Sequence, residues 1–407
     1  MDLARDPSSQ PRPGSEQSHR EPLNKFSRSR GPCAQIESYP DLASVSDLWR
    51  ELETAGASGP YQRRAWFKAW TTSVAVERGE RPLIVVARDE QSRPTFLLPL
   101  VVRASLGLTI ARFAGGKHAN FNTPVLARGV QLGPHDVHHA LAAVARLEPD
   151  IDLFLLDALP ASFDGTPNPL VGPNADIHTA QGSLITLTTE GEPPVRSKRL
   201  REERRRERGL LRHGSVEIRV ASGEAEIQQA LSVFADQKAY WFAGRKMPNP
   251  FKEAGVPAFL NSLARDPDSG FVLHTLLVGG VVVAVSGTLK VRERASLMLV
   301  SYDATSSTAA FGPGTRLIRA VMAQMRRDGC TEFDLGLGEA AYKLALGARA
   351  VPVYILAQPA NARGRIGAAV LGLARRGKIL TKRHPQLVHL LQQLRTLRPV
   401  RRPDVVP

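Results

Sequence analysis

The stretch of sequence that decides the fold is residues 297–347, LMLVSYDATSSTAAFGPGTRLIRAVMAQMRRDGCTEFDLGLGEAAYKLALG. It begins with a β-rich run (297–303), which is followed by a glycine loop (311–314), an amphipathic helix (315–328), a second β-rich run (331–335) and the segment GLGEAAYK (336–343). The change from alternating to helical periodicity and back is typical of an α/β unit.

Two parts of this stretch indicate chemistry. A glycine turn that opens a helix presents free N–H groups and the positive end of the helix dipole to an anion. Glu339, Tyr342 and Lys343 follow the end of a strand, which is where α/β proteins usually carry their functional groups. The order of these features predicts an acyltransferase that holds a donor with a pyrophosphate group.

Composition limits the classes of protein to be considered. With 407 residues, 43% hydrophobic and 23% charged, the chain is long enough for two globular domains with tails. No segment has the length and apolarity of a transmembrane helix, and the polar N-terminus lacks a signal-peptide core. Cys33 and Cys330 are too few for a disulfide framework, so we expect a cytoplasmic protein.

The net charge of +15 is concentrated in two segments. Residues 196–212 carry nine Arg or Lys and three Glu, a net +6, and residues 359–407 carry eleven Arg or Lys and one Asp, a net +10. The rest of the chain is therefore at about −1, which argues against a nucleic-acid surface over the whole fold.

Five segments can be distinguished. We expect a disordered arm at 1–36, an N-terminal domain at 37–195, a basic linker helix at 196–213, a C-terminal domain at 214–358 and a basic amphipathic tail at 359–407. Each domain contains a predicted hairpin (82–103 and 271–291) and then a helix followed by a strand. The helix and strand within 135–157 parallel those within 314–335 in character, which predicts tandem duplication of one α/β unit.

At three sites the chain resembles the GNAT acyltransferase superfamily, and more narrowly the tandem-GNAT, CelD-like acetyltransferases of cellulose and exopolysaccharide biosynthesis. These sites are 333–339 with Tyr342-Lys343, the loop Gly312-Pro313-Gly314, and the run 113–121. The resemblance implies an α/β fold of two similar GNAT-like domains, a mixed sheet splayed at its centre, and acetyl-CoA as co-substrate with no metal. It places the donor pyrophosphate at Gly312, Gly314, Thr315 and Arg316, and the donor site in the second domain.

Four side chains are candidates for catalysis. The resemblance gives Tyr342 the role of general acid. Glu339 is either the base, a group that orients the acceptor, or a carboxylate that caps the next helix. Asp334 alternates with apolar Phe333 and Leu335, so it faces either a site or solvent, and we favour the site. Asp303 is the second candidate for the base, with a turn former as its alternative.

Three further residues are candidates for binding the acceptor. His118 and Asn120 lie in a first-domain loop that can reach across the domain interface, and a turn held by the Asn side chain is the alternative. Lys343 can pair with a phosphate or an acidic substrate, or lie exposed. The acceptor predicted from the resemblance is an amine or hydroxyl of a small molecule, sugar or envelope precursor.

Two other functions remain open. The tandem architecture is shared by aminoacyl-tRNA-dependent transferases of the peptidoglycan-bridge type, in which the Arg-rich segment would hold tRNA. A non-catalytic scaffold in polysaccharide synthesis is the other alternative. The tail alternates basic and apolar residues, with 387–397 apolar on one side, so we expect it to lie on an anionic membrane surface or to dock on the protein body.

Overall fold

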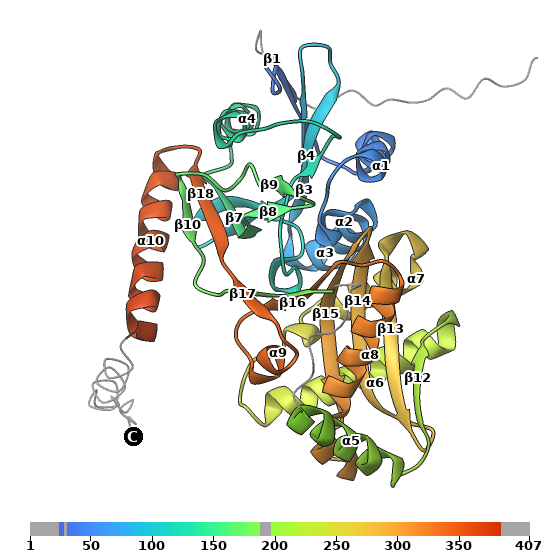
Figure 1. Ribbon diagram of the computed structural model, residues 1–407. Helices are drawn as coiled ribbons and strands as arrows, with labels where there is room; N and C mark the ends of the chain where they lie inside the picture. The colour runs from blue at the N-terminus through green and yellow to red at the C-terminus, as the bar shows by residue number, and fades with distance from the viewer. Residues whose placement is uncertain (1–23, 28–30, 188–196, 384–407) are drawn as a thin grey trace, which may run out of the picture.

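The computed structural model describes residues 24–27, 31–187 and 197–383, and it consists of two α/β halves that lie one above the other (Figure 1). Within these residues the first half is built on a nine-stranded mixed sheet and the second on a seven-stranded one. Ten α-helices lie in the same residues: α1 (Ser46–Ala55), α2 (Arg64–Thr71), α3 (Val74–Arg78), α4 (Pro134–Leu147), α5 (Ser197–Leu211), α6 (Gly223–Ala243), α7 (Val256–Arg265), α8 (Pro313–Arg327), α9 (Ala341–Ala345) and α10 (Ala362–Arg383).

The first sheet has the order β1-β2-β3-β4-β5-β7-β18-β10, with β6 beside β4. Its strands are β1 (Asn24–Ser27), β2 (Gln35–Tyr39), β3 (Arg81–Arg88), β4 (Pro94–Ser105), β5 (Leu108–Phe113), β6 (Val125–Leu126), β7 (Leu153–Pro160), β10 (Ala175–Ile177) and β18 (Val353–Pro359). A separate small hairpin pairs β8 (Ser162–Phe163) with β9 (Thr166–Pro167).

The second sheet has the order β12-β13-β14-β15-β16-β11-β17. Its strands are β11 (Gly182–Thr186), β12 (Val216–Val220), β13 (Phe271–Val278), β14 (Val281–Val291), β15 (Arg294–Tyr302), β16 (Glu332–Leu337) and β17 (Arg349–Val351). The predicted hairpin forms at Gly279-Gly280, where φ is +57° and +81°. Two positive φ values match the right-handed twist of the flanking strands and are cheapest for glycine.

The same arrangement occurs in both halves, so the predicted pair of similar units is confirmed. An antiparallel strand pair (β4 and β5, or β14 and β15) leads into a helix (α4 or α8), and the helix leads into a strand parallel to the previous one (β7 or β16). The α/β class predicted from the sequence, with the mixed sheet that the resemblance implies, is therefore the observed one.

The two halves exchange strands. β11 comes from the first half of the chain but pairs with β16 and β17 of the second sheet. β18 comes from the end of the second half but pairs with β7 and β10 of the first sheet. The sheets therefore do not follow the expected boundary near residue 195, and neither half completes its sheet without the other.

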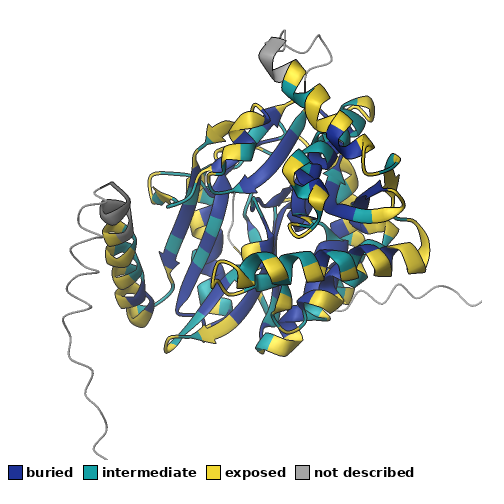
Figure 2. Cartoon of the chain, turned by 90° about the horizontal axis from the view of Figure 1, so that it is seen from below, coloured by how far each residue is buried: buried dark blue, intermediate teal, exposed yellow. Residues whose placement is uncertain are grey.

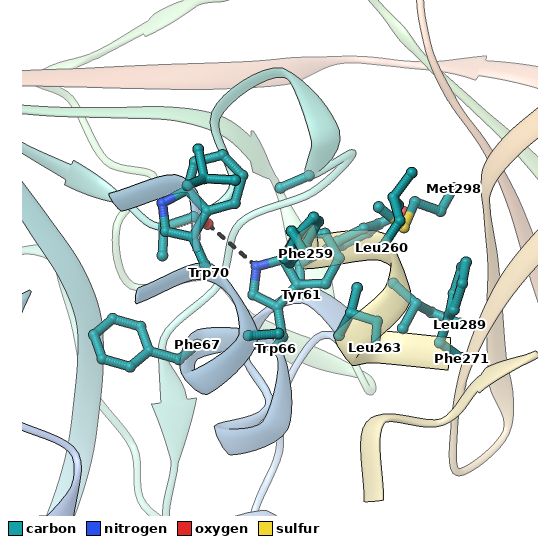
Figure 3. Close-up of a cluster of buried hydrophobic side chains, with 14 of the residues drawn as sticks. Tyr61, Trp66, Phe67, Trp70, Phe259, Leu260, Leu263, Phe271, Leu289 and Met298 are labelled. Carbon is teal, nitrogen blue, oxygen red and sulfur yellow. Dashed lines mark hydrogen bonds between the residues drawn. The ribbon is translucent and has the colours of Figure 1, made fainter. Parts of the chain in front are cut away.

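An aromatic core joins the halves (Figure 3). Phe259 of α7 packs edge-to-face on Trp66 and Trp70 of α2, with ring centroids 4.9 and 5.3 Å apart. The helical spacing of Trp66, Phe67 and Trp70 predicted core or inter-domain packing, and all three side chains are buried there. Such aromatic contacts stabilise the relative position of the two halves beyond simple burial.

The expectation for the N-terminal arm needs correction where the structure describes it. β1 and β2 pair with each other, and Phe26 packs against the first-half core with the Arg146 guanidinium 5.4 Å from its ring centre. These contacts give residues 24–27 and 35–36 an ordered place in the sheet. The rest of the predicted arm, 1–23 and 28–30, lies outside the described residues, as does 384–407 of the tail.

Burial follows the sheets, whose central strands are buried while helix faces such as the outer side of α10 are exposed (Figure 2). Among the described residues, no helix has both the length and the apolarity to cross a bilayer.

Candidate active site

A splay between two parallel strands forms the centre of the candidate site. β15 and β16 pair only from Arg294 to Ser296 and from Glu332 to Asp334, and beyond these residues they diverge. A cavity of about 270 Å³ opens there, lined by 297–300 on one strand and 335–340 on and after the other. Since separated strands cannot satisfy each other's backbone groups, those groups can bind a ligand in the gap.

The N-terminus of α8 forms the second part of the site. Gly312 is the N-cap residue with φ of +64°, Pro313 follows at the first helical position, and the first turn contains no acidic residue. The N–H groups of Gly314 and Thr315 belong to the first turn of the helix, which has no helical acceptors for them. This end of the helix is therefore suited to a phosphate.

A cleft of about 680 Å³ lies over this helix end, between α5, α8 and α9. Gly312, Thr315 and Arg316, all predicted to bind the donor, line it, whereas the buried Gly314 does not. A Cβ atom added to Gly314 would lie 3.4 Å from the Tyr302 ring, which is an ordinary van der Waals contact, so the packing of α8 on β15 does not itself require glycine here.

The basic segment is docked on α8. Gly209 lies so close to Phe311 that any side chain there would clash, and Leu210 is buried in the second-half core. Ion pairs between Glu207 and Arg316, at 3.1 Å, and between Glu203 and Arg319, at 3.1 Å, hold α5 against α8. The predicted basic linker helix is thus also a wall of the cleft.

This docking brings in a cation that sequence reasoning missed. The Arg206 guanidinium lies 3.3 Å from where a Cβ atom of Gly312 would be, and Arg206 lines the cleft. It also pairs with Glu202 at 2.9 Å. Its position depends on how α5 packs on α8, and no local sequence pattern distinguishes it from the other arginines of the segment.

Tyr342 connects the two parts of the site. It lies on α9, the short helix after β16, as predicted, and it lines both the 270 Å³ cavity and the 680 Å³ cleft. Burial and the negative charge of Asp334 raise the pKa of the Tyr342 hydroxyl. Since both effects favour the protonated phenol, the side chain is suited to donate a proton.

Glu339 lines the cavity beside Tyr342 and is exposed. Its predicted alternative role as a helix cap is not observed, because Ala340 occupies the N-cap position of α9 and the helix has no side-chain cap. The two remaining roles are those of a base and of a group that orients the acceptor. Both require a carboxylate at the cavity, and Glu339 lies there.

Asp334 is buried in a hydrogen-bond network that crosses the interface between the halves. Its Oδ2 accepts from Asn120 Nδ2, at 2.8 Å, and from the Ser296 hydroxyl, and its Oδ1 accepts from Gly336 N at 2.6 Å. Tyr61 of the first half is hydrogen-bonded to Ser296. Burial raises the pKa of the Asp334 carboxyl. Asp334 thus does not line the splay cavity; it borders a separate pocket of about 210 Å³ together with Tyr61 and Ser296, and its bond to Asn120 ties the halves together.

Of the acceptor-site candidates, Asn120 and Lys343 line the splay cavity and His118 does not. Asn120 lines the splay cavity while it bonds Asp334 and, at 3.2 Å, the Leu297 carbonyl. The cavity is therefore built from both halves, with Asn120 as the contribution of the first.

Lys343 has a different role from the predicted one. Its ammonium donates to the carbonyls of Gly336, Leu337 and Gly338 at 3.0, 2.9 and 2.9 Å. These bonds use all three N–H groups of a lysine, so Lys343 braces the loop before α9 and has no donor left for a substrate.

His118 and Asp303 also have structural roles. The His118 ring is buried among Trp70, Phe251 and Phe259, and burial lowers the pKa of the imidazole to about 4, so it is a neutral core residue. Asp303 accepts from Thr305 N, at 2.9 Å, and from the Thr305 hydroxyl, at 2.6 Å, which makes it a turn former. Neither residue lines the splay cavity.

The first half lacks the corresponding donor features. β5 and β7 pair over two residues, and beyond them Asn122 bonds the β7 carbonyls of Asp157 and Ala158 at 2.9 Å each. At the N-terminus of α4 the Asp136 carboxylate accepts from Gly133 N at 2.9 Å. A carboxylate at that helix end repels a phosphate, so only the second half is suited to the donor.

Comparisons with known proteins agree with this architecture. Residues 197–344 match the model of the acetyltransferase (GNAT) domain. FemX superposes with a TM-score of 0.53 at 9% identity, over 78% of this chain and 96% of that one. A conserved protein of unknown function from Bacteroides thetaiotaomicron VPI-5482 does so with a TM-score of 0.51 at 10% identity, over 79% and 98%. No curated protein matches the sequence.

Residues 197–344, which include the linker helix α5, thus match a GNAT-type acetyltransferase domain, and the described residues form two similar α/β units. At these low identities, the likeness to solved structures concerns the fold and leaves the reaction to be argued from the site.

Proposed function

We propose that the protein transfers an acyl group, acetyl in the simplest case, from acyl-CoA to an amine or hydroxyl of a small molecule or of a sugar or envelope precursor. The observation that carries this proposal is the position of Tyr342, which lines both the cleft over the α8 N-terminus and the splay cavity. If the pyrophosphate of the donor binds at Gly312, Thr315 and Arg316, the thioester end can therefore extend past Tyr342 into the splay cavity.

The reaction needs groups that the site contains. Glu339 is placed to take a proton from the acceptor, whose nitrogen or oxygen then attacks the thioester carbonyl. Unpaired backbone groups along β15 can stabilise the oxyanion that forms. When the C–S bond breaks, the thiolate takes a proton from Tyr342, and the tyrosinate is reprotonated from solvent. Asn120, Lys343 and Asp334 keep the two walls of the cavity in place.

Binding of acetyl-CoA is the first test, measured by titration calorimetry with the Thr315→Glu variant as its control. The wild-type protein is expected to bind saturably. The new carboxylate stands in the third helical position of α8, where an acid stabilises the helix while repelling a pyrophosphate. We therefore expect binding at least about tenfold weaker with undiminished thermal stability.

Two results would contradict the proposal. Absence of binding by the wild-type protein would favour the aminoacyl-tRNA-dependent transferase or the scaffold, and charged tRNA would then be titrated at low and high salt. Equal binding by the wild type and Thr315→Glu would remove the helix end from the donor site.

The outer face of α10 supports a second proposal, that the tail lies on an anionic membrane surface. Ile366, Val370 and Leu373 are 69, 59 and 67% exposed and follow one another at helical spacing. The sequence of α10 has seven basic residues and no acidic one. Its inner face docks through glycine, since a Cβ atom at Gly367 would lie 2.3 Å from Leu108, which leaves the apolar stripe facing outward.

Sedimentation with vesicles tests this membrane contact. The full chain is expected to sediment with phosphatidylglycerol vesicles but not with phosphatidylcholine vesicles. Replacing Ile366, Val370 and Leu373 together by Ser should weaken the interaction at least about tenfold. Val76→Ser, at a residue that is 69% exposed on α3, is the matched control. The proposal would be contradicted if the triple variant sedimented as strongly as the wild type, or if the wild type sedimented equally with the two kinds of vesicle.

A further inference from the structure

One wall of the splay cavity carries a lysine that the proposed reaction does not use. Lys238 lies on α6 and lines the cavity together with Phe251 and Asn120. Tyr342, at the donor cleft, lines the same cavity from α9. Once a donor thioester has entered past Tyr342, the α6 wall remains for the acceptor.

The surroundings of Lys238 are aromatic. Its ammonium lies 5.4, 5.9 and 5.7 Å from the ring centres of Trp241, Phe242 and Phe251. Rings attract a cation, but they offset only part of what burial costs an ammonium group. A group in such a place is stabilised further by an anion.

The charged groups around Lys238 do not supply that anion. Arg245, further along α6, repels it, and Lys343 on α9 adds a second positive charge to the cavity. Glu339 is the acid that lines the cavity, and among the described residues no ion pair joins it to Lys238. Burial and the charge of Arg245 lower the pKa of Lys238 to about 8, so it is still mainly protonated at neutral pH.

We propose that Lys238 binds a carboxylate of the acceptor, so that the acceptor is a small amine that carries a carboxylate, such as an amino acid. The cavity of about 270 Å³ is small for a ligand site and must also admit the end of the donor, which favours an acceptor of this size. The assignment rests on the proposed acyl transfer and specifies its acceptor.

The test compares acids with matched amides. The common amino acids and their carboxamides are offered with acetyl-CoA, and release of CoA thiol is followed. For at least one amino acid, the wild type should prefer the acid at least about tenfold in kcat/KM, Lys238→Met should lose the preference, and Lys238→Arg should retain it. Lys252→Met, at an exposed lysine outside the cavity, is the matched control.

The pH dependence gives a second readout. Lys238 must be protonated to bind a carboxylate, so KM for the acid should rise in the wild type as pH passes through about 8. The KM of Lys238→Arg should not rise in this range, because a guanidinium stays charged. Equal use of acids and amides by the wild type, or an unchanged preference in Lys238→Met, would overturn the proposal.

Binding can be measured without the donor. The chain has four tryptophans, of which Trp241 lies beside Lys238 and the other three are fully buried. Amino acids should therefore quench tryptophan fluorescence saturably in the wild type and not in Lys238→Met. If the protein failed to bind acetyl-CoA but still showed this quenching, the proposed acyl transfer would be contradicted and the carboxylate site would stand. Quenching by inorganic phosphate at lower concentration than by every amino acid would overturn the carboxylate assignment.

Discussion

Replacing Tyr342 by Phe is expected to lower kcat for acyl transfer about 100- to 1,000-fold while leaving acetyl-CoA binding unchanged. The variant keeps the ring that separates the donor cleft from the splay cavity and removes only the hydroxyl. Without that proton donor, the CoA sulfur must leave as a thiolate. The measurement is the rate of thiol release at saturating donor and acceptor, with acetyl-CoA affinity determined by calorimetry.

The pH profile separates this role from a structural one. Burial and the charge of Asp334 hold the pKa of Tyr342 above the usual value of about 10. The wild type should therefore keep its general acid up to high pH and lose activity only as the phenol ionises, and Tyr342→Phe should lack that decline. Tyr240→Phe, an exposed tyrosine on α6, is the matched control. Full activity of Tyr342→Phe would favour the scaffold.

The order of elements could be predicted from the sequence, because each is encoded locally. The alternating runs of β13 and β14, the glycine pair between them and the apolar stripe of α8 are signals within a few residues of one another. Strand exchange could not be predicted in this way. β11 and β17 are short strands of five and three residues. The sheet that β11 joins is set by a partner strand more than a hundred residues away in the sequence.

The same distinction between local and long-range signals applies to the residues of the candidate site. Tyr342, Glu339 and the glycine loop could be named as candidates from the sequence because they follow a strand or open a helix, and the role of Tyr342 came from the resemblance. Lys343 was misassigned because the residue type does not tell whether an ammonium meets a substrate or three carbonyls of its own loop. Arg206 and Lys238 were missed because they reach the site only through the docking of α5 and the packing of α6.

Asp334→Ala is expected to lower the free energy of unfolding by about 3 kcal/mol at acidic pH, because it removes the acceptor for three buried donors. These are Asn120 Nδ2, the Ser296 hydroxyl and Gly336 N, and the first belongs to the opposite half. Urea unfolding of the full chain measures the change. Asp236→Ala, at an exposed carboxylate on α6, is the matched control.

The effect should depend on pH in a direction that the pKa of Asp334 determines. Burial raises that pKa in the folded state, so the network is most stable below the unfolded pKa of about 3.9, and this stability is lost as pH rises through the folded value. The difference between wild type and Asp334→Ala should therefore shrink from acidic toward neutral pH, and Asp334→Asn should lack this slope. A difference that grew as pH rose would show instead that the ionised carboxylate is the form that holds the halves together.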